Sequence, residues 1–196
     1  MRYADDCNIY VRSERAGQRV MDSIKRFIAE RLKLKVNEAK SAAARPQERK
    51  FLGFSFTGGP EIRRTIAPKA VARFKEKIRE ITRRAKGVSI ETTIATVAPY
   101  MRGWRGYFGF CETPSLLIQL SRWVRRRLRA ALWRQWKTQR RRRAMLIQLG
   151  VRGQLADNTA GSGLGPWHLA HSKAVNIALS NTYFRKHGLP SLFESC

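Results

Sequence analysis

The chain has 196 residues, of which 43% are hydrophobic, and its net charge is +26 with an isoelectric point near 11.4. The hydrophobic content excludes a disordered tail, and the lack of any long apolar run or leading signal peptide speaks against a membrane-spanning or secreted protein. So large a positive charge repels itself in a compact state, which favours an anionic partner: nucleic acid first, an anionic membrane surface second.

The first 67 residues predict a small mixed region of strands and one helix. The opening MRYADDCNIYV predicts a β-hairpin with Asp5 and Asp6 at its tip. Apolar residues three or four apart predict a helix at about 14–31, and the alternation in LKLKV predicts a short strand at 32–36. The turn sequence TGGP, at 57–60, predicts that strands at 51–56 and 61–67 pair with each other.

From Pro68 onward the apolar spacing becomes helical. The pattern predicts a helix from Pro68 that stops before Gly87, and a second helix capped by Ser89 that Pro99 must kink or end. A third helix is predicted from Pro114, in a segment closed by a glycine at 150. The tail, 151–196, reads as loop-rich, with one short helical stretch near 173–179. The predicted fold class is therefore α+β, with regions at 1–67, 68–150 and 151–196.

An arginine-rich segment stands out between residues 122 and 143. It contains eleven Lys and Arg residues and no Asp or Glu, so ion pairs along the helix cannot balance its charge. Trp123, Trp133 and Trp136 interleave with the arginines. A solvated helix face is the ordinary explanation, but the uncompensated charge favours phosphate binding, with an affinity that falls steeply as salt rises.

The adjacent carboxylates of Asp5 and Asp6 allow two interpretations. A polar pair of this kind is often a solvated turn. Two-metal phosphoryl transfer, however, needs carboxylates held rigidly on strands around cations about 4 Å apart. Together with the basic helices, the pair suggests part of a nucleotidyl transferase.

The order of several short motifs carries a more specific resemblance. YADD (3–6), LKLKVNEAKS (32–41), FLGF (51–54) and RGWRGYFGF (102–110) follow one another, and WRQWK, GPW and NTYFRKHGLPSL follow in the second half. In this order the chain resembles the bacterial group II intron reverse transcriptase/maturases. The resemblance implies part of a reverse-transcriptase palm at 1–67, a helical thumb and maturase-specific domain at 68–150, and a loop-rich basic C-terminal region.

The resemblance also implies roles for single residues. Asp5 and Asp6 would bind Mg²⁺ as part of a two-metal site, and Lys40 would assist the leaving pyrophosphate. Phe51, Gly53 and Phe54 would belong to the hairpin that grips the primer. Other residues implied to bind nucleic acid are Tyr3, Arg102, Arg105, Arg122, Arg125, Arg126, Arg129, Arg134, Lys137, Arg140 and Arg141. The aromatic residues Trp104, Tyr107 and Phe108 are expected to pack between helices instead.

The family's polymerases use a further metal-binding aspartate and a fingers region upstream of YADD, and neither is found in this sequence. We therefore expect a truncated enzyme that binds intron RNA and a template–primer duplex, aids splicing and intron mobility, and does not polymerise alone. The alternatives are an RNA-binding splicing or folding factor without catalysis, a subunit completed in trans by a fingers–palm polypeptide, and a decayed reading frame. Three scattered cysteines and no Cys/His cluster favour a reducing, cytoplasmic setting without a zinc site.

Overall fold

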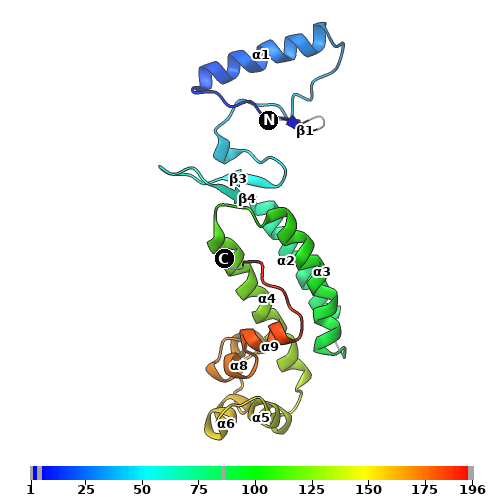
Figure 1. Cartoon of the computed structure of the whole chain (residues 1–196), viewed down its shortest axis with the longest axis vertical. Coiled ribbons are helices and arrows are strands. Elements are labelled where there is room, and N and C mark those ends of the chain that lie inside the picture. The colour runs from blue at the N-terminus through cyan, green and yellow to red at the C-terminus, as the bar shows by residue number, and fades with distance from the viewer. Residues whose placement is uncertain (1, 4–5, 85–86, 194–196) are drawn as a thin grey trace. The chain divides into compact units, whose positions relative to one another are not determined.

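The computed structural model describes residues 2–3, 6–84 and 87–193, without the side chains of Arg2, Tyr3, Asp6 and Arg84. The chain divides into two compact units: unit 1, Met1–Ala70, and unit 2, Val71–Cys196. Unit 1 combines short antiparallel strand pairs with helices, and unit 2 is helical, so the α+β prediction is confirmed (Figure 1).

Unit 1 contains two hairpins and one long helix. Strands β1 (Arg2–Tyr3) and β2 (Asp6–Cys7) pair antiparallel, with Tyr3 opposite Asp6. Asp6 therefore opens the second strand and does not stand in the turn as predicted, whereas Asp5 lies outside the described residues. Helix α1 (Glu14–Glu30) matches its predicted range because Ser13 caps it, with the Ser13 hydroxyl accepting from the Ala16 N–H at 3.2 Å.

The prediction of a strand at 32–36 is wrong. The Leu34 N–H donates to the carbonyl oxygen of Ile28 at 3.1 Å, and Lys33 has a left-handed φ of 52°, so the chain closes the helix end before it can extend. The prediction rested only on the alternation of apolar and basic residues, but a strand also needs a neighbouring strand for its backbone hydrogen bonds. The stretch runs on as a loop to the short 3₁₀ helix η1 (Pro46–Glu48).

The second hairpin is confirmed, although it is shorter than predicted. Strand β3 (Phe54–Phe56) pairs antiparallel with β4 (Arg64–Ile66). Before β3, Phe51 and Phe54 exchange backbone hydrogen bonds of 2.9 Å, and Leu52 and Gly53 between them have φ values of 51° and 78°. These are features of a two-residue turn with both central residues left-handed, so FLGF is a turn leading into the strand.

Unit 1 buries little of its own apolar surface. Helix α1 has no buried residue, and the buried apolar residues among those described in unit 1 are Ile66 and Ala67. Phe27, on α1, is 55% exposed.

The first three long helices of the second half match their predicted starts. They are α2 (Pro68–Arg84), α3 (Ile90–Phe108) and α4 (Pro114–Gln135). Helix α3 does not end at Pro99. It continues because Pro99 is exposed, while apolar residues on both sides of it, such as Val97 and Met101, are fully buried.

Helix α3 packs on α2 through aromatic rings. The Phe74 ring lies 4.6 Å from that of Trp104, which lies 4.7 Å from that of Phe108. The packing predicted for Trp104 and Phe108 is thus confirmed. Tyr107 packs its ring against Phe108 of the same helix, with 4.7 Å between the ring centroids, and is 47% exposed, so its packing between helices stays a prediction.

The arginine-rich segment lies on two helices, not on one. Helix α4 ends at Gln135, and α5 (Gln139–Gln148) starts after Thr138, whose hydroxyl accepts from the Arg141 N–H at 3.2 Å. Leu128 and Trp133 of α4 are fully buried, so this helix is the centre of unit 2's core.

The tail is far more ordered than the predicted loop-rich region. It contains α6 (Gly153–Ala160), α7 (Pro166–Leu169), α8 (Lys173–Ala178) and α9 (Asn181–Lys186). Figure 1 shows α8 and α9 beside α4, and α5 beside α6. The helical stretch predicted near 173–179 is confirmed as α8. The other three helices bury small residues, such as Ala156 of α6, or a single large one, Leu169 of α7 and Phe184 of α9, so no stripe of large apolar residues marks them in the sequence. After α9, the Leu192 N–H donates to the Ser121 hydroxyl of α4 at 3.1 Å. None of the described helices has the length and apolar character needed to cross a membrane.

Candidate nucleic-acid interface

The arginines of α4 do not all face solvent. Arg129 is only 8% exposed; its Nε donates to the carbonyl oxygen of Leu179 at 2.9 Å and its guanidinium lies 5.7 Å from the centre of the Phe184 ring. Burial, with a smaller effect from the Arg125 cation, lowers the pKa of Arg129 to about 10. This predicted RNA-binding residue is thus engaged inside the helical unit, so we leave it out of the candidate interface.

A second arginine joins α4 to α2. Arg127 donates from Nε and Nη2 to the Thr82 hydroxyl at 3.1 and 3.0 Å. Its pKa is lowered by burial first and then by the nearby cations Arg79, Arg134 and Arg83. The motif reasoning did not single out Arg127, although the cations that surround it from two helices make this a strongly positive part of unit 2.

Trp123 lies at the centre of that positive region. Three cations approach its ring: Lys75 at 5.9 Å, Arg79 at 5.5 Å and Arg127 at 5.6 Å from the centroid. Such cation–π contacts hold the charges on one surface. Lys75 and Arg79 are four residues apart on α2, a spacing that could have been read from the sequence, but only the packing of α2 on α4 shows that they share a tryptophan.

The other residues predicted to bind nucleic acid are half-buried or exposed. Arg125, half-buried beside Arg122, has a pKa lowered by burial and then by the Arg122 cation. Arg105 of α3 is half-buried as well. The exposed members are Arg102 on α3, Arg122 and Arg134 on α4, Lys137 in the break, and Arg140 and Arg141 on α5.

Acidic neighbours are rare along this segment. Among the described residues, Arg143 forms an ion pair with Asp157 of α6, and Arg142 donates to the Trp136 carbonyl at 2.9 Å. The remaining positive charge has no carboxylate within residues 122–143 to offset it. The surface formed by the exposed cations of α3, α4 and α5 is therefore suited to a polyanion; we call it the basic helical surface.

The predicted catalytic residues belong to unit 1. Asp5 lies outside the described residues, and for Tyr3 and Asp6 the backbone alone is described, paired across β1 and β2. Lys40 is exposed, in a turn where its N–H donates to the Asn37 side-chain oxygen at 3.2 Å. Within the described residues, no group of three or more His, Cys, Asp and Glu side chains could hold a metal ion.

The residues predicted to grip the primer lie together at the second hairpin. Phe51 and Gly53 belong to the turn that leads into β3 and Phe54 is the first residue of that strand, with the Arg64 guanidinium of β4 6.0 Å from the centre of the Phe54 ring. A glycine is favoured at position 53 because its φ of 78° lies in the left-handed region, which other residues seldom adopt.

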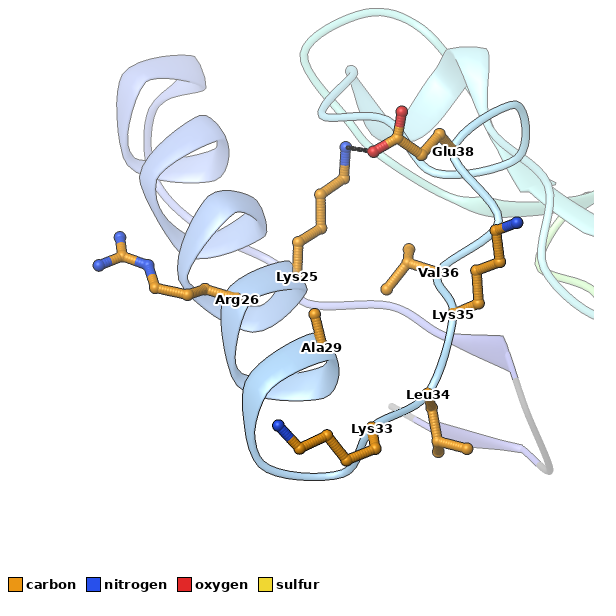
Figure 2. Close-up of a pocket in the computed structure, with 8 residues that line it drawn as sticks. All are labelled: Lys25, Arg26, Ala29, Lys33, Leu34, Lys35, Val36 and Glu38. Atoms are coloured by element: carbon orange, nitrogen blue, oxygen red, sulfur yellow. Dashed lines mark ion pairs between the residues drawn. The ribbon is translucent and has the colours of Figure 1, made fainter.

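Unit 1 also has a shallow basic pocket that sequence reasoning missed. It lies between α1 and the loop that follows, and Figure 2 shows Lys25 and Arg26 on the helix and Lys33 and Lys35 on the loop. Lys25 forms an ion pair with Glu38 at 3.6 Å across the pocket. The cations come together because the chain turns back at Lys33 and does not extend as a strand.

Two family models match the chain, one in each of its two units. Residues 1–56 match the family model of the reverse transcriptase (RNA-dependent DNA polymerase), and residues 71–147 match that of the group II intron maturase-specific domain. No curated protein matches the chain. The first match lies within unit 1 and the second within unit 2, which contains the basic helical surface.

Proposed function

Because the chain belongs to the group II intron reverse transcriptase/maturase family, we propose that the basic helical surface binds structured intron RNA through its phosphates. The observation that carries the proposal is the outward-facing set of cations on α4 and α5, in a segment without a single acid. Phosphate contacts position an RNA on this surface without reading its sequence. Specificity for one intron then has to come from other contacts.

A salt titration of RNA binding tests this function. The full chain is mixed with a labelled group II intron RNA, and the affinity is measured by fluorescence anisotropy at several salt concentrations. The double variant Arg140→Gln/Arg141→Gln should lower the affinity and make the plot of log affinity against log salt shallower by roughly one unit for each phosphate that the protein no longer neutralises.

The matched control changes the same charge elsewhere. Arg15 and Arg19 are exposed on α1, and the variant Arg15→Gln/Arg19→Gln should leave the salt dependence as it is in the wild type. Equal effects of the two double variants would show that binding follows net charge and not the basic helical surface.

For unit 1 we propose that Asp5 and Asp6 supply the chain's carboxylate ligands for Mg²⁺. Carboxylate oxygens are the donors that Mg²⁺ prefers, and the backbone of Asp6 is held in a strand by its pairing with Tyr3. When bound, Mg²⁺ would stabilise the charge that develops on the reacting phosphate oxygens. Tyr3, Phe51 and Phe54 would contribute contacts to the primer end, and Lys40 a positive charge for the leaving pyrophosphate.

The second candidate function is an RNA-binding splicing factor without catalysis. It is favoured by the uneven burial, since nearly all the buried apolar residues are in unit 2. Primer extension on an RNA template with Mg²⁺ tests the role of the carboxylates. Extension by the wild type that Asp5→Asn abolishes would show that the chain polymerises alone and would exclude the splicing factor, whereas intron binding without extension is expected of the splicing factor and of the truncated enzyme alike.

A further inference from the structure

Trp167 of α7 is arranged unlike the other tryptophans in the described part of the chain. Trp104, Trp133 and Trp136 are buried, and Trp123 is half-buried among three cations. Trp167, by contrast, is 41% exposed. Its indole is thus accessible from solvent although it sits in a folded unit.

One face of this indole is covered by a fixed cation. The Arg126 guanidinium lies 4.0 Å from the ring centroid, which is close enough for stacking, and its Nε and Nη2 donate to the Trp167 carbonyl oxygen at 3.2 and 3.0 Å. The two hydrogen bonds and the stack hold α7 against α4 and fix the plane of the ring. Since the guanidinium covers one face, we infer that the exposed area lies on the other face and the ring edges.

The surroundings of the exposed face suit a nucleotide. Arg122 is exposed one helical turn before Arg126 on α4, and His168 and His171, one and four residues after Trp167, are exposed as well. Burial and the neighbouring cations Arg126 and Arg129 lower the pKa of His171, which favours its neutral form as a hydrogen-bonding group. A flat aromatic face, a cation for phosphate and hydrogen-bonding side chains are the groups that hold single-stranded bases in RNA-binding proteins.

We propose that the Trp167 indole, backed by Arg126, stacks on an unpaired base of the bound RNA while Arg122 contacts a neighbouring phosphate. This inference rests on the proposed RNA binding and adds a preference for unpaired nucleotides to it. Because Arg126 fixes the ring before RNA binds, little side-chain freedom is lost on stacking.

The test compares two RNAs and three variants of the full chain. One RNA is a hairpin with an adenosine-rich loop, and the other is a fully paired duplex with the same number of phosphates. Trp167→Ala should weaken binding to the hairpin about 5- to 100-fold and leave binding to the duplex unchanged. Trp167→Phe should keep most of the hairpin affinity, whereas Trp167→Leu, apolar but not aromatic, should lose it.

Salt dependence gives a second readout that mere damage to the fold would not reproduce. Removal of a stacking residue should leave the slope of log affinity against log salt unchanged, while Arg122→Gln should make it shallower. The matched control Phe27→Leu, at an exposed aromatic residue of α1, should not change the ratio of hairpin to duplex affinity.

Three results would overturn the inference. They are equal weakening of hairpin and duplex by Trp167→Ala, full hairpin affinity in Trp167→Leu, and no effect of any Trp167 variant. If the wild type bound neither RNA, the proposed function would fail as well, so the two failures are distinguishable.

Discussion

Helices α1 and α4 have the same kind of apolar spacing but differ in how much of it is buried. Both helices have regularly spaced apolar residues, yet α1 has no buried residue while α4 buries nine, among them Leu128 and Trp133. The spacing defines which side of a helix is apolar, but not what covers that side. Burial of apolar side chains therefore stabilises unit 2, whereas the apolar side of α1 contributes little to the free energy of unfolding of unit 1.

The strongest way to break this comparison is to remove one large side chain from each unit. Leu128→Ala should lower the free energy of unfolding by about 2–5 kcal/mol, because Leu128 is 0% exposed and its loss leaves a cavity. Phe27→Ala, at a residue that is 55% exposed, should change it by less than about 0.5 kcal/mol. Urea unfolding followed by circular dichroism measures both. Similar losses in the two variants would show that α1 is covered after all.

A second comparison is between two arginines of α4. Arg129→Ala should destabilise the chain by about 1.5–3 kcal/mol, since it leaves the Leu179 carbonyl without its charged donor. Exposed Arg122→Ala should leave the urea midpoint unchanged and weaken RNA binding. Weaker RNA binding by a stably folded Arg129→Ala variant would put Arg129 back into the interface.

The helix caps sharpen the comparison further. Ser13 caps α1 and Ser89 caps α3, each accepting a backbone N–H at 3.2 Å. Ser89→Ala should lower the stability of the cooperative unit by about 1 kcal/mol, because α3 is packed into the core. Ser13→Ala should instead increase hydrogen exchange at the start of α1 without moving the urea midpoint. A shifted midpoint for both would contradict the separation of the units.

The smallest expected effect depends on pH. The pKa of Glu91 is lowered by the backbone N–H and the Ser89 hydroxyl that its carboxylate accepts from, and its carboxylate lies 3.3 Å from His187. A lowered pKa in the folded state means that Glu91 stabilises the fold above its ordinary pKa of 4.5 and that this contribution disappears as the pH falls through the folded-state pKa. Glu91→Gln should therefore lower the thermal midpoint slightly at pH 7 and leave it unchanged at pH 3. A difference that persists at pH 3 would point to the loss of packing and not of charge.

The sequence predicted most of the long helices because their ends are marked by local chemistry. Pro68, Ser89 and Pro114 mark helix starts where expected, and the strand pair predicted around the TGGP turn is in place. The prediction of a strand at 32–36 was wrong because an alternating pattern does not show whether a neighbouring strand is available for pairing. In the tail, α8 was predicted near 173–179, whereas α6, α7 and α9 were missed because they are short and bury few residues: α6 buries three, and α7 and α9 bury one each.

The candidate interface could be predicted as a region but not residue by residue. An acid-free run of arginines is plain in the sequence, yet the inward turn of Arg129 toward Leu179 depends on a residue fifty positions away. The stacking of Arg126 on Trp167 likewise needs α7 to fold back on α4. Contacts between residues so far apart in the sequence depend on how the helices pack, which cannot be read from the apolar spacing within one helix.

The hydrogen bond from Leu192 to Ser121 has a consequence for the order of events during protein synthesis. Ser121 lies on α4 and is translated seventy-one residues before its partner. Until Leu192 has left the ribosome, this side of α4 lacks its cover, and a chaperone that recognises apolar segments would find it open. Nascent chains still attached to the ribosome at that codon should therefore be less resistant to protease than the same chain after its release.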